Sequence, residues 1–317
     1  MGAAINTGHF SEYNYSTIAA QEYNLATAEN ECKWAATEPN QGIFDFDPCD
    51  LVMNFTLEHD MIFRGHNLCW GSYNPSWLNE LNTYNDLSNA LSNHINQVVS
   101  HYGSKNVIAW DVVNEALSDY STGDDWEYKT STWYPMVPDF VNIAFTTARA
   151  SCPDCKLFYN DYDIASSSGW MKSKSDAVYS FVSELLSQGI PIDGIGMQLH
   201  LSMNFGDFDG IRDNIQRLYD LGLETHFTEI DVACGSYPDY DCPTWGETEE
   251  AIQANVYEQL LIICLNEPGC TSFETWGFTD KYTWLTSEDG TDQHPLPFDD
   301  QYVKKPAYNS LIDVLTQ

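Results

Sequence analysis

Short apolar runs of strand character alternate with longer helical patterns along this chain, and this alternation constrains the fold more than any other feature. The predicted strands cover residues 3–6, 26–29, 61–66, 107–114, 156–160, 194–200, 224–229 and 271–276. The clearest helical patterns cover residues 87–102, 139–150, 175–188, 208–221 and 247–265. Gly189 and Gly222 directly follow two of these helices, as C-terminal caps do. Eight alternations over 317 residues predict an α/β protein, a single (β/α)8 TIM barrel.

The chain is expected to form one domain. No Ser/Thr/Pro run, charge block or internal repeat marks a linker, so residues 1–317 are predicted to be a single catalytic barrel without an accessory module. The first five residues resemble the start of a strand and not a signal peptide, and we expect a mature chain that begins there. No apolar stretch is long enough to span a bilayer, which argues against a membrane partner.

Polar side chains gather where the predicted strands end. In a barrel of parallel strands these carboxyl ends form one rim, and that rim carries the active site. A chance distribution would place polar residues at both ends of the barrel. The residues concerned are Glu29, Asn30, Lys33, His66, Trp70, Asn114, Glu115, Asn160, Gln198, His200, Glu229, Asp231 and Trp276.

Two glutamates carry the strongest chemical signal. Glu115 and Glu229 each close a short hydrophobic strand, 114 residues apart in the chain. The dipeptides alone mean little, since Asn-Glu and Thr-Glu recur elsewhere, and a single charged residue at a strand end is usually solvated. Two carboxyls on two strand ends of one barrel suggest a glycosidase, with one acting as acid and the other as nucleophile.

Net charge and cysteine content limit which binding partners and which cellular compartment we expect for this chain. The net charge of −34 argues against nucleic acid, which needs clustered Lys and Arg, and is compatible with a neutral polymer. Nine cysteines and two glycosylation sequons, 14–16 and 54–56, point to a secreted protein. Cys264–Cys270 and Cys234–Cys242 are plausible disulfides, and the odd count leaves at least one free thiol or an intermolecular bond. A lone C-x-x-C pair at 152–155 does not establish a metal or redox site.

The chain resembles glycoside hydrolase family 10, the endo-β-1,4-xylanases, nearly from end to end. Relatives with similar cysteine-rich insertions suggest a fungal source. The resemblance implies a secreted monomer that acts on xylan and xylo-oligosaccharides without metal or organic cofactor. The matching segments are 29–34, 64–70, 75–77, 110–115, 159–162, 194–201, 228–231, 276–284 and 305–308.

The resemblance also implies a retaining mechanism with roles for individual residues. Glu229 would attack the anomeric carbon, and Glu115 would protonate the leaving oxygen and then activate water. His200 would hydrogen-bond Glu229, with Asp231 orienting its ring. Asn114 would bind the sugar 2-hydroxyl.

Further residues are expected to bind the sugar chain around these groups. Trp276 and Trp284 would form a wall that disfavours the C6 hydroxymethyl of glucose. The resemblance places Glu29, Asn30 and Lys33 in a clamp on the non-reducing side and His66 in the cleavage subsite. Gln198, Asn160 and Trp70 would line the cleft.

Some residues depart from the family pattern, and two other functions compete with a xylanase. Cys32, Ala35, Gly71, Met197 and Leu285 stand where the family commonly has other residues. Gly71 and Leu285 border the cleft, so the family pattern does not predict the subsite affinities or the preferred chain length. The first alternative is a β-1,4-glucanase or mannanase on the same barrel. The second is a catalytically inactive xylan-binding protein or protein inhibitor, against which the intact glutamates argue.

Overall fold

Parallel strands close into a ring in the computed structural model, which describes residues 1–103, 105–236, 241–285 and 292–316. The hydrogen-bonded order is β6-β5-β4-β3-β2-β1-β9-β8, and a β6–β8 pairing completes the barrel. This arrangement confirms the predicted (β/α)8 fold. The strands are β1 (Gly2–Ile5), β2 (Leu25–Ala28), β3 (Ile62–Trp70), β4 (Val107–Asn114), β5 (Lys156–Asp161), β6 (Gly194–Met197), β7 (His200–Ser202), β8 (Glu224–Ala233) and β9 (Cys270–Thr275).

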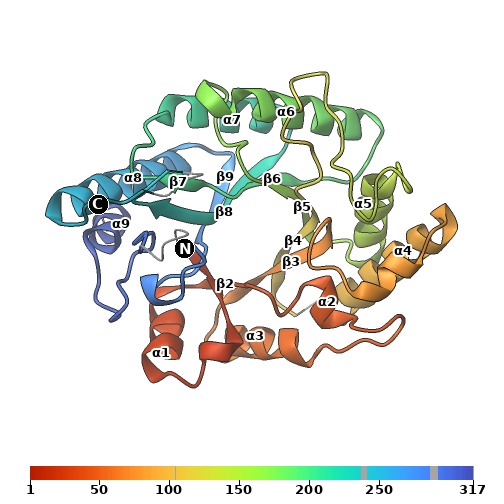
Figure 1. The fold of residues 1–317 in the computed structure, drawn as a ribbon, viewed down its shortest axis with the longest axis horizontal. Helices are drawn as coiled ribbons and strands as arrows, with labels where there is room; N and C mark the ends of the chain where they lie inside the picture. The colour runs from red at the N-terminus through yellow and green to blue at the C-terminus, as the bar shows by residue number, and fades with distance from the viewer. Residues whose placement is uncertain (104, 237–240, 286–291, 317) are drawn as a thin grey trace.

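Helices cover the outside of this barrel (Figure 1). The five predicted helices are present with their ends shifted by at most three residues. Gly189 and Gly222 follow two of them at φ +74° and +83°, as predicted for C-terminal caps. The α-helices are α1 (Tyr13–Glu22), α2 (Trp34–Thr37), α3 (Asp47–Glu58), α4 (Tyr84–Tyr102), α5 (Phe140–Ser151), α6 (Lys172–Ser187), α7 (Phe208–Asp220), α8 (Glu247–Asn266) and α9 (Pro306–Leu315). Short 3-10 turns are η1 (Thr7–His9), η2 (Ser76–Glu80), η3 (Gly169–Met171) and η4 (Asp280–Tyr282).

Three strand boundaries were predicted wrongly. The strand predicted over 194–200 is two strands, because Leu199 adopts φ +59° and interrupts the run. β3 and β8 continue past His66 and Glu229, so these side chains lie within strands and not at their ends. Pairing slips between His66 and Cys69 in β3 and between Phe227 and Ile230 in β8. Such bulges interrupt the regular alternation of side chains along a strand. The interruption redirects polar side chains toward the rim.

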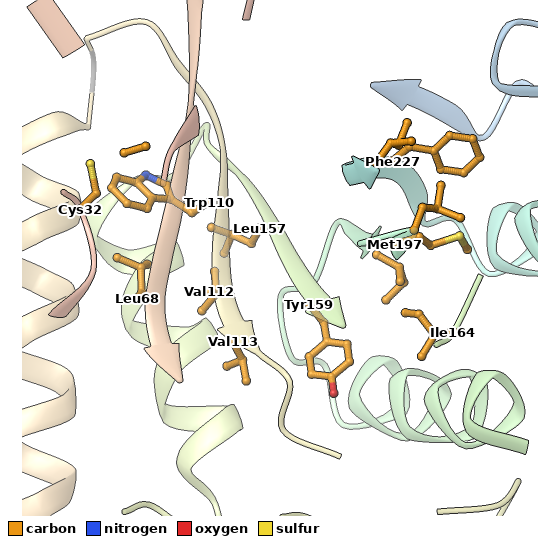
Figure 2. Packing of buried hydrophobic residues seen from close by; sticks show 14 of the residues in the cluster. Cys32, Leu68, Trp110, Val112, Val113, Leu157, Tyr159, Ile164, Met197 and Phe227 are labelled. Atoms are coloured by element: carbon orange, nitrogen blue, oxygen red, sulfur yellow. The ribbon is translucent and has the colours of Figure 1, made fainter. Parts of the chain in front are cut away.

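The core between strands and helices is apolar and closely packed (Figure 2). Trp110 of β4 is fully buried there, and its indole occupies the space where a Cβ on the neighbouring Gly65 would lie, 2.1 Å away. The barrel interior instead holds a buried ionic cluster, in which Arg64 contacts Asp111 at 2.5 Å and Glu274 at 4.0 Å. This charged layer forms the floor beneath the rim.

Disulfides join neighbouring parts of the chain. Cys234–Cys242 and Cys264–Cys270 confirm the predicted pairs, and Cys69 is the free, buried thiol. Two further disulfides, Cys32–Cys49 and Cys152–Cys155, were not predicted. The second shows that the C-x-x-C pair is itself a disulfide. Among the described helices, none has the length and apolar character needed to cross a membrane.

Candidate active site

Glu115 directly follows β4 at the rim of the barrel. Its backbone has φ +54°, a conformation that residues other than glycine rarely adopt. Each carboxyl oxygen accepts one hydrogen bond: Oε2 from Nε1 of Trp70 at 3.0 Å, and Oε1 from Nε2 of Gln198 at 2.9 Å. β3 and the segment after β6 therefore hold this carboxyl from two sides.

Glu229 lies in the bulged part of β8, with 5% of its surface exposed. Nδ2 of Asn160 donates to its Oε1 at 2.7 Å, and Nε2 of His200 lies 3.4 Å from its Oε2. On the other side of the imidazole, Nδ1 of His200 lies 2.8 Å from Oδ2 of Asp231. The ring is therefore fixed between two carboxylates.

Amide side chains connect the two glutamates into one network. Oδ1 of Asn114 accepts from Nδ2 of Asn160 at 2.8 Å and from Nε2 of Gln198 at 3.4 Å. These two amides are the ones that donate to Glu229 and Glu115. Thr228, which the sequence reasoning missed, donates to Oδ1 of Asn160 at 2.7 Å and so fixes the orientation of that amide.

The environments shift the pKa values of the two glutamates in opposite directions. Burial raises the pKa of Glu115, and the charges of Asp161 and Glu229 raise it further. Burial also acts to raise the pKa of Glu229, but hydrogen bonding from His200 and the charge of His66 outweigh it and lower the pKa. A pair of carboxyls separated in this way can hold one proton acid and one charged nucleophile at the same pH.

His200 supplies much of this separation. Burial alone would lower its pKa, but the Asp231 carboxylate and the hydrogen bond to Glu229 outweigh burial and raise the pKa to about 10. The imidazole is therefore a cation at neutral pH, and its charge favours the ionised form of Glu229.

A buried lysine lies within the electrostatic range of both Glu229 and Glu115. Lys33 is 6% exposed, and its Nζ donates to Oδ1 of Asn30 at 2.8 Å. The ammonium also lies over the ring of Tyr73 at 4.0 Å and near Trp70 at 5.3 Å. Burial lowers the pKa of Lys33, although nearby carboxylates oppose this. With one hydrogen bond made, this ammonium has donors left for a ligand's hydroxyls.

The remaining predicted binding residues lie around this centre. Nδ1 of His66 is 3.0 Å from Asp111, and its ring meets Trp276 edge-on at 5.2 Å. Trp284 is 54% exposed, and its Nε1 donates to Oδ2 of Asp231 at 3.0 Å. The carboxylate of Glu29 accepts from Nδ2 of Asn6 at 3.1 Å.

A cavity of about 160 Å³ opens beside Glu115. Trp70 and Gly71 form one wall, and Lys129 and Ser131 from the loop between β4 and α5 form another. Sequence reasoning missed this second wall, as it missed Tyr73, because loop residues carry no hydrophobic period. In the parts of the chain that the structure describes, no cluster of three His, Cys, Asp or Glu side chains could hold a metal ion.

Comparison with known proteins assigns the chain to a family. The model of glycosyl hydrolase family 10 matches residues 1–314. Endo-1,4-beta-xylanase B of Neocallimastix patriciarum is 38% identical over 99% of the chain, which spans 34% of that protein. Endo-1,4-beta-xylanase B of Thermotoga neapolitana is 34% identical over 96% of the chain and 84% of that protein. The structure of xylanase 10B from Thermotoga petrophila with xylobiose superimposes with a TM-score of 0.87, at 34% identity, over 99% of this chain and 93% of that one.

Proposed function

The chain belongs to glycosyl hydrolase family 10, and from this premise we propose that it is an endo-1,4-β-xylanase that cleaves internal bonds of xylan with retention of configuration. Glu229 is the nucleophile, and Glu115 is the acid/base. The observation that carries the assignment is the opposite shift of the two pKa values within one hydrogen-bonded network. The names of its xylanase relatives support the choice of substrate.

In the first step Glu229 attacks the anomeric carbon while the proton of Glu115 passes to the glycosidic oxygen as its bond to carbon breaks. This step needs Glu229 charged and Glu115 protonated, as their pKa shifts favour. Esterification removes the charge of Glu229, so the pKa of Glu115 falls and its carboxylate can take a proton from water. Water then releases the sugar from Glu229.

The neighbouring groups bind and orient the sugar. Asn114 faces the 2-hydroxyl next to the nucleophile, in a position fixed by the amides of Asn160 and Gln198. Lys33 and Asn30 bind hydroxyls on the non-reducing side. Trp276 and Trp284 form the wall that favours xylose over glucose, because a C6 hydroxymethyl group would meet an indole.

Paired variants test the assignment of the nucleophile. Glu229→Ala and Glu115→Ala are assayed on xylan, on carboxymethyl cellulose and on an aryl xylobioside in the presence of azide. Azide should rescue each variant with a different product: the α-glycosyl azide with Glu229→Ala, and the β-glycosyl azide with Glu115→Ala, since only the second still forms a covalent intermediate. Equal or greater wild-type activity on cellulose would instead favour the glucanase alternative.

We further propose that the chain acts as one catalytic domain, as a monomer, and that it is a secreted glycoprotein. Four disulfides and two exposed sequon asparagines, Asn14 and Asn54, support secretion. Expression in a eukaryotic secretory host should give a product whose mass falls on endoglycosidase treatment. Asn14→Gln with Asn54→Gln should abolish that change, and a wild-type product of unmodified mass would oppose the glycoprotein proposal.

A further inference from the structure

β5 directs consecutive side chains to opposite sides of the barrel wall, as a strand must. Asn160 points inward and donates to Glu229 at 2.7 Å. Tyr159 and Asp161 point outward, toward the helices. The ring of Tyr159 meets Phe181 of α6 edge-on at 5.3 Å, within the buried cluster of Figure 2. The outward residues are therefore outside the cleft and cannot contact substrate directly.

The hydroxyl of Tyr159 is nevertheless bonded to the chain next to Glu115. It accepts hydrogen bonds from the backbone N–H groups of Ala116 and Leu117, both at 3.1 Å. It donates to Oδ2 of Asp161 at 2.5 Å. A phenol has one proton to donate and two lone pairs to accept, so every bonding position of this hydroxyl is used.

Asp161 is itself held in place. Its Oδ1 accepts from Nζ of Lys174 at 2.9 Å and from the backbone N–H of Tyr162 at 2.9 Å. Both Asp161 and Lys174 are buried, and Lys174 also binds Asp119 at 2.9 Å. The acceptor for the Tyr159 proton is therefore a buried carboxylate whose other oxygen is held by two donors.

The backbone of Glu115 is held on both sides of its Cα. Its own N–H donates to the carbonyl of Asn160 at 2.9 Å, and the two N–H groups that follow it donate to Tyr159. Between these anchors Glu115 adopts φ +54°. A residue other than glycine keeps such a conformation when the surrounding bonds impose it, and strain of this kind gathers at functional sites.

We propose that Tyr159 is a positioning residue for Glu115: its hydroxyl, oriented by Asp161, fixes the backbone after Glu115 so that the carboxyl meets the glycosidic oxygen. Tyr159 exchanges no proton with substrate. The proton still passes from Glu115 to the leaving oxygen as that oxygen's bond to carbon breaks. This inference rests on the proposed acid/base role of Glu115.

Leaving groups of different basicity test the proposal. A poor leaving group, such as phenol or a second sugar, needs the proton of Glu115, whereas 2,4-dinitrophenol leaves without it. Tyr159→Phe is expected to lower kcat/KM about 10- to 100-fold for phenyl xylobioside, a part of what general acid catalysis contributes, and to leave kcat/KM for 2,4-dinitrophenyl xylobioside within about twofold. Tyr102→Phe is the matched control, because it removes an equally buried hydroxyl that bonds Phe46 away from the site.

Several outcomes would oppose the proposal. An equal loss on both substrates would mean that Tyr159 only supports the fold, and no loss on either would mean that the anchor is dispensable. If Tyr159→Phe does not fold, as thermal unfolding would show, Asp161→Asn replaces it, since that change weakens the acceptor for the same hydroxyl with little change of shape. Because the charge of Asp161 also raises the pKa of Glu115, kcat/KM of this variant is compared at the plateau of its pH profile. Glu115→Ala is assayed in parallel. If its kcat/KM falls equally for phenyl and 2,4-dinitrophenyl xylobioside, the proposed acid/base role of Glu115 has failed, and not only the positioning role of Tyr159.

Discussion

Oδ2 of Asp231 lies 2.8 Å from Nδ1 of His200 and fixes the imidazole whose other nitrogen faces the Glu229 carboxylate at 3.4 Å. Asp231 thus acts on Glu229 through His200. The Asp231 carboxylate keeps the imidazole charged, and the charged imidazole keeps Glu229 ionised. We therefore expect the acid side of the pH profile to depend on Asp231 as well as on His200.

His200→Gln should move the acid limb of the kcat/KM profile to higher pH. The wild-type histidine lowers the pKa of Glu229 against the effect of burial, so a neutral replacement lets that pKa rise, and activity is lost at a higher pH on acidification. The measurement is kcat/KM on phenyl xylobioside between about pH 3 and pH 8. Asp231→Asn should shift the limb in the same direction. An acid limb that stays in place in both variants would contradict this action of Asp231 on Glu229 through His200.

Gln198→Leu should move the opposite limb. Gln198 donates to Oε1 of Glu115 and so stabilises its charged form, which lowers the pKa against the effects of burial and of Asp161. Without that hydrogen bond the pKa of Glu115 rises, the proton is kept to higher pH, and the alkaline limb of kcat/KM moves upward. Gln216→Leu, on the exposed face of α7, serves as the control. A downward shift would oppose this account.

Lys33→Met should weaken substrate binding more than it slows the chemical step. The variant keeps the buried stem but removes the donors that we assign to sugar hydroxyls. A hydrogen bond to a charged group contributes about 1.5–3 kcal/mol, so KM for xylohexaose should rise about 10- to 100-fold. Lys172→Met, on an exposed part of α6, is the matched control. An unchanged KM in Lys33→Met would show that Lys33 does not bind the sugar hydroxyls assigned to it.

Trp284→Ala should relax the choice between xylose and glucose. If the indole excludes the hydroxymethyl group, the ratio of kcat/KM for aryl cellobioside to aryl xylobioside should rise about 10- to 200-fold, which corresponds to about 1–3 kcal/mol. Trp284 also donates to Asp231, so overall activity should fall as well. Trp284→Phe separates the two effects, because it keeps a wall but loses the N–H. A ratio that does not change in Trp284→Ala would refute the wall.

Removing the Cys32–Cys49 disulfide should destabilise the fold. The bond joins residues 17 apart, and closing a loop of that size stabilises by about 3 kcal/mol in the chain-entropy model. Cys32→Ala with Cys49→Ala should lower the free energy of unfolding in urea by about 2–4 kcal/mol. Cys234→Ala with Cys242→Ala, which opens an eight-residue separation, should cost less. The reverse order of stabilities would count against the loop-length argument.

Local pattern was enough to predict the barrel and the rim. Apolar runs and helical periods depend only on residues close together in the sequence, so they can be recognised without a structure. Parallel strands then bring their carboxyl ends to one edge of the barrel. Trp70, Asn160 and His200 therefore came together although they lie far apart in the chain. The predicted ends of β3 and β8 were wrong, because the bulges near His66 and Glu229 depend on pairing with a neighbouring strand.

The sequence by itself determined the fold class, the family and the set of polar residues at the rim. The tertiary structure alone decided which of them touch, and hence their proton affinities. The backbone N–H groups that follow Glu115 donate to the hydroxyl of Tyr159, and the amide of Asn160 donates to Glu229, across 42 to 69 positions of the chain. The geometry of these hydrogen bonds depends on how closely strands and helices pack, and burial there shifts a pKa that no local pattern encodes.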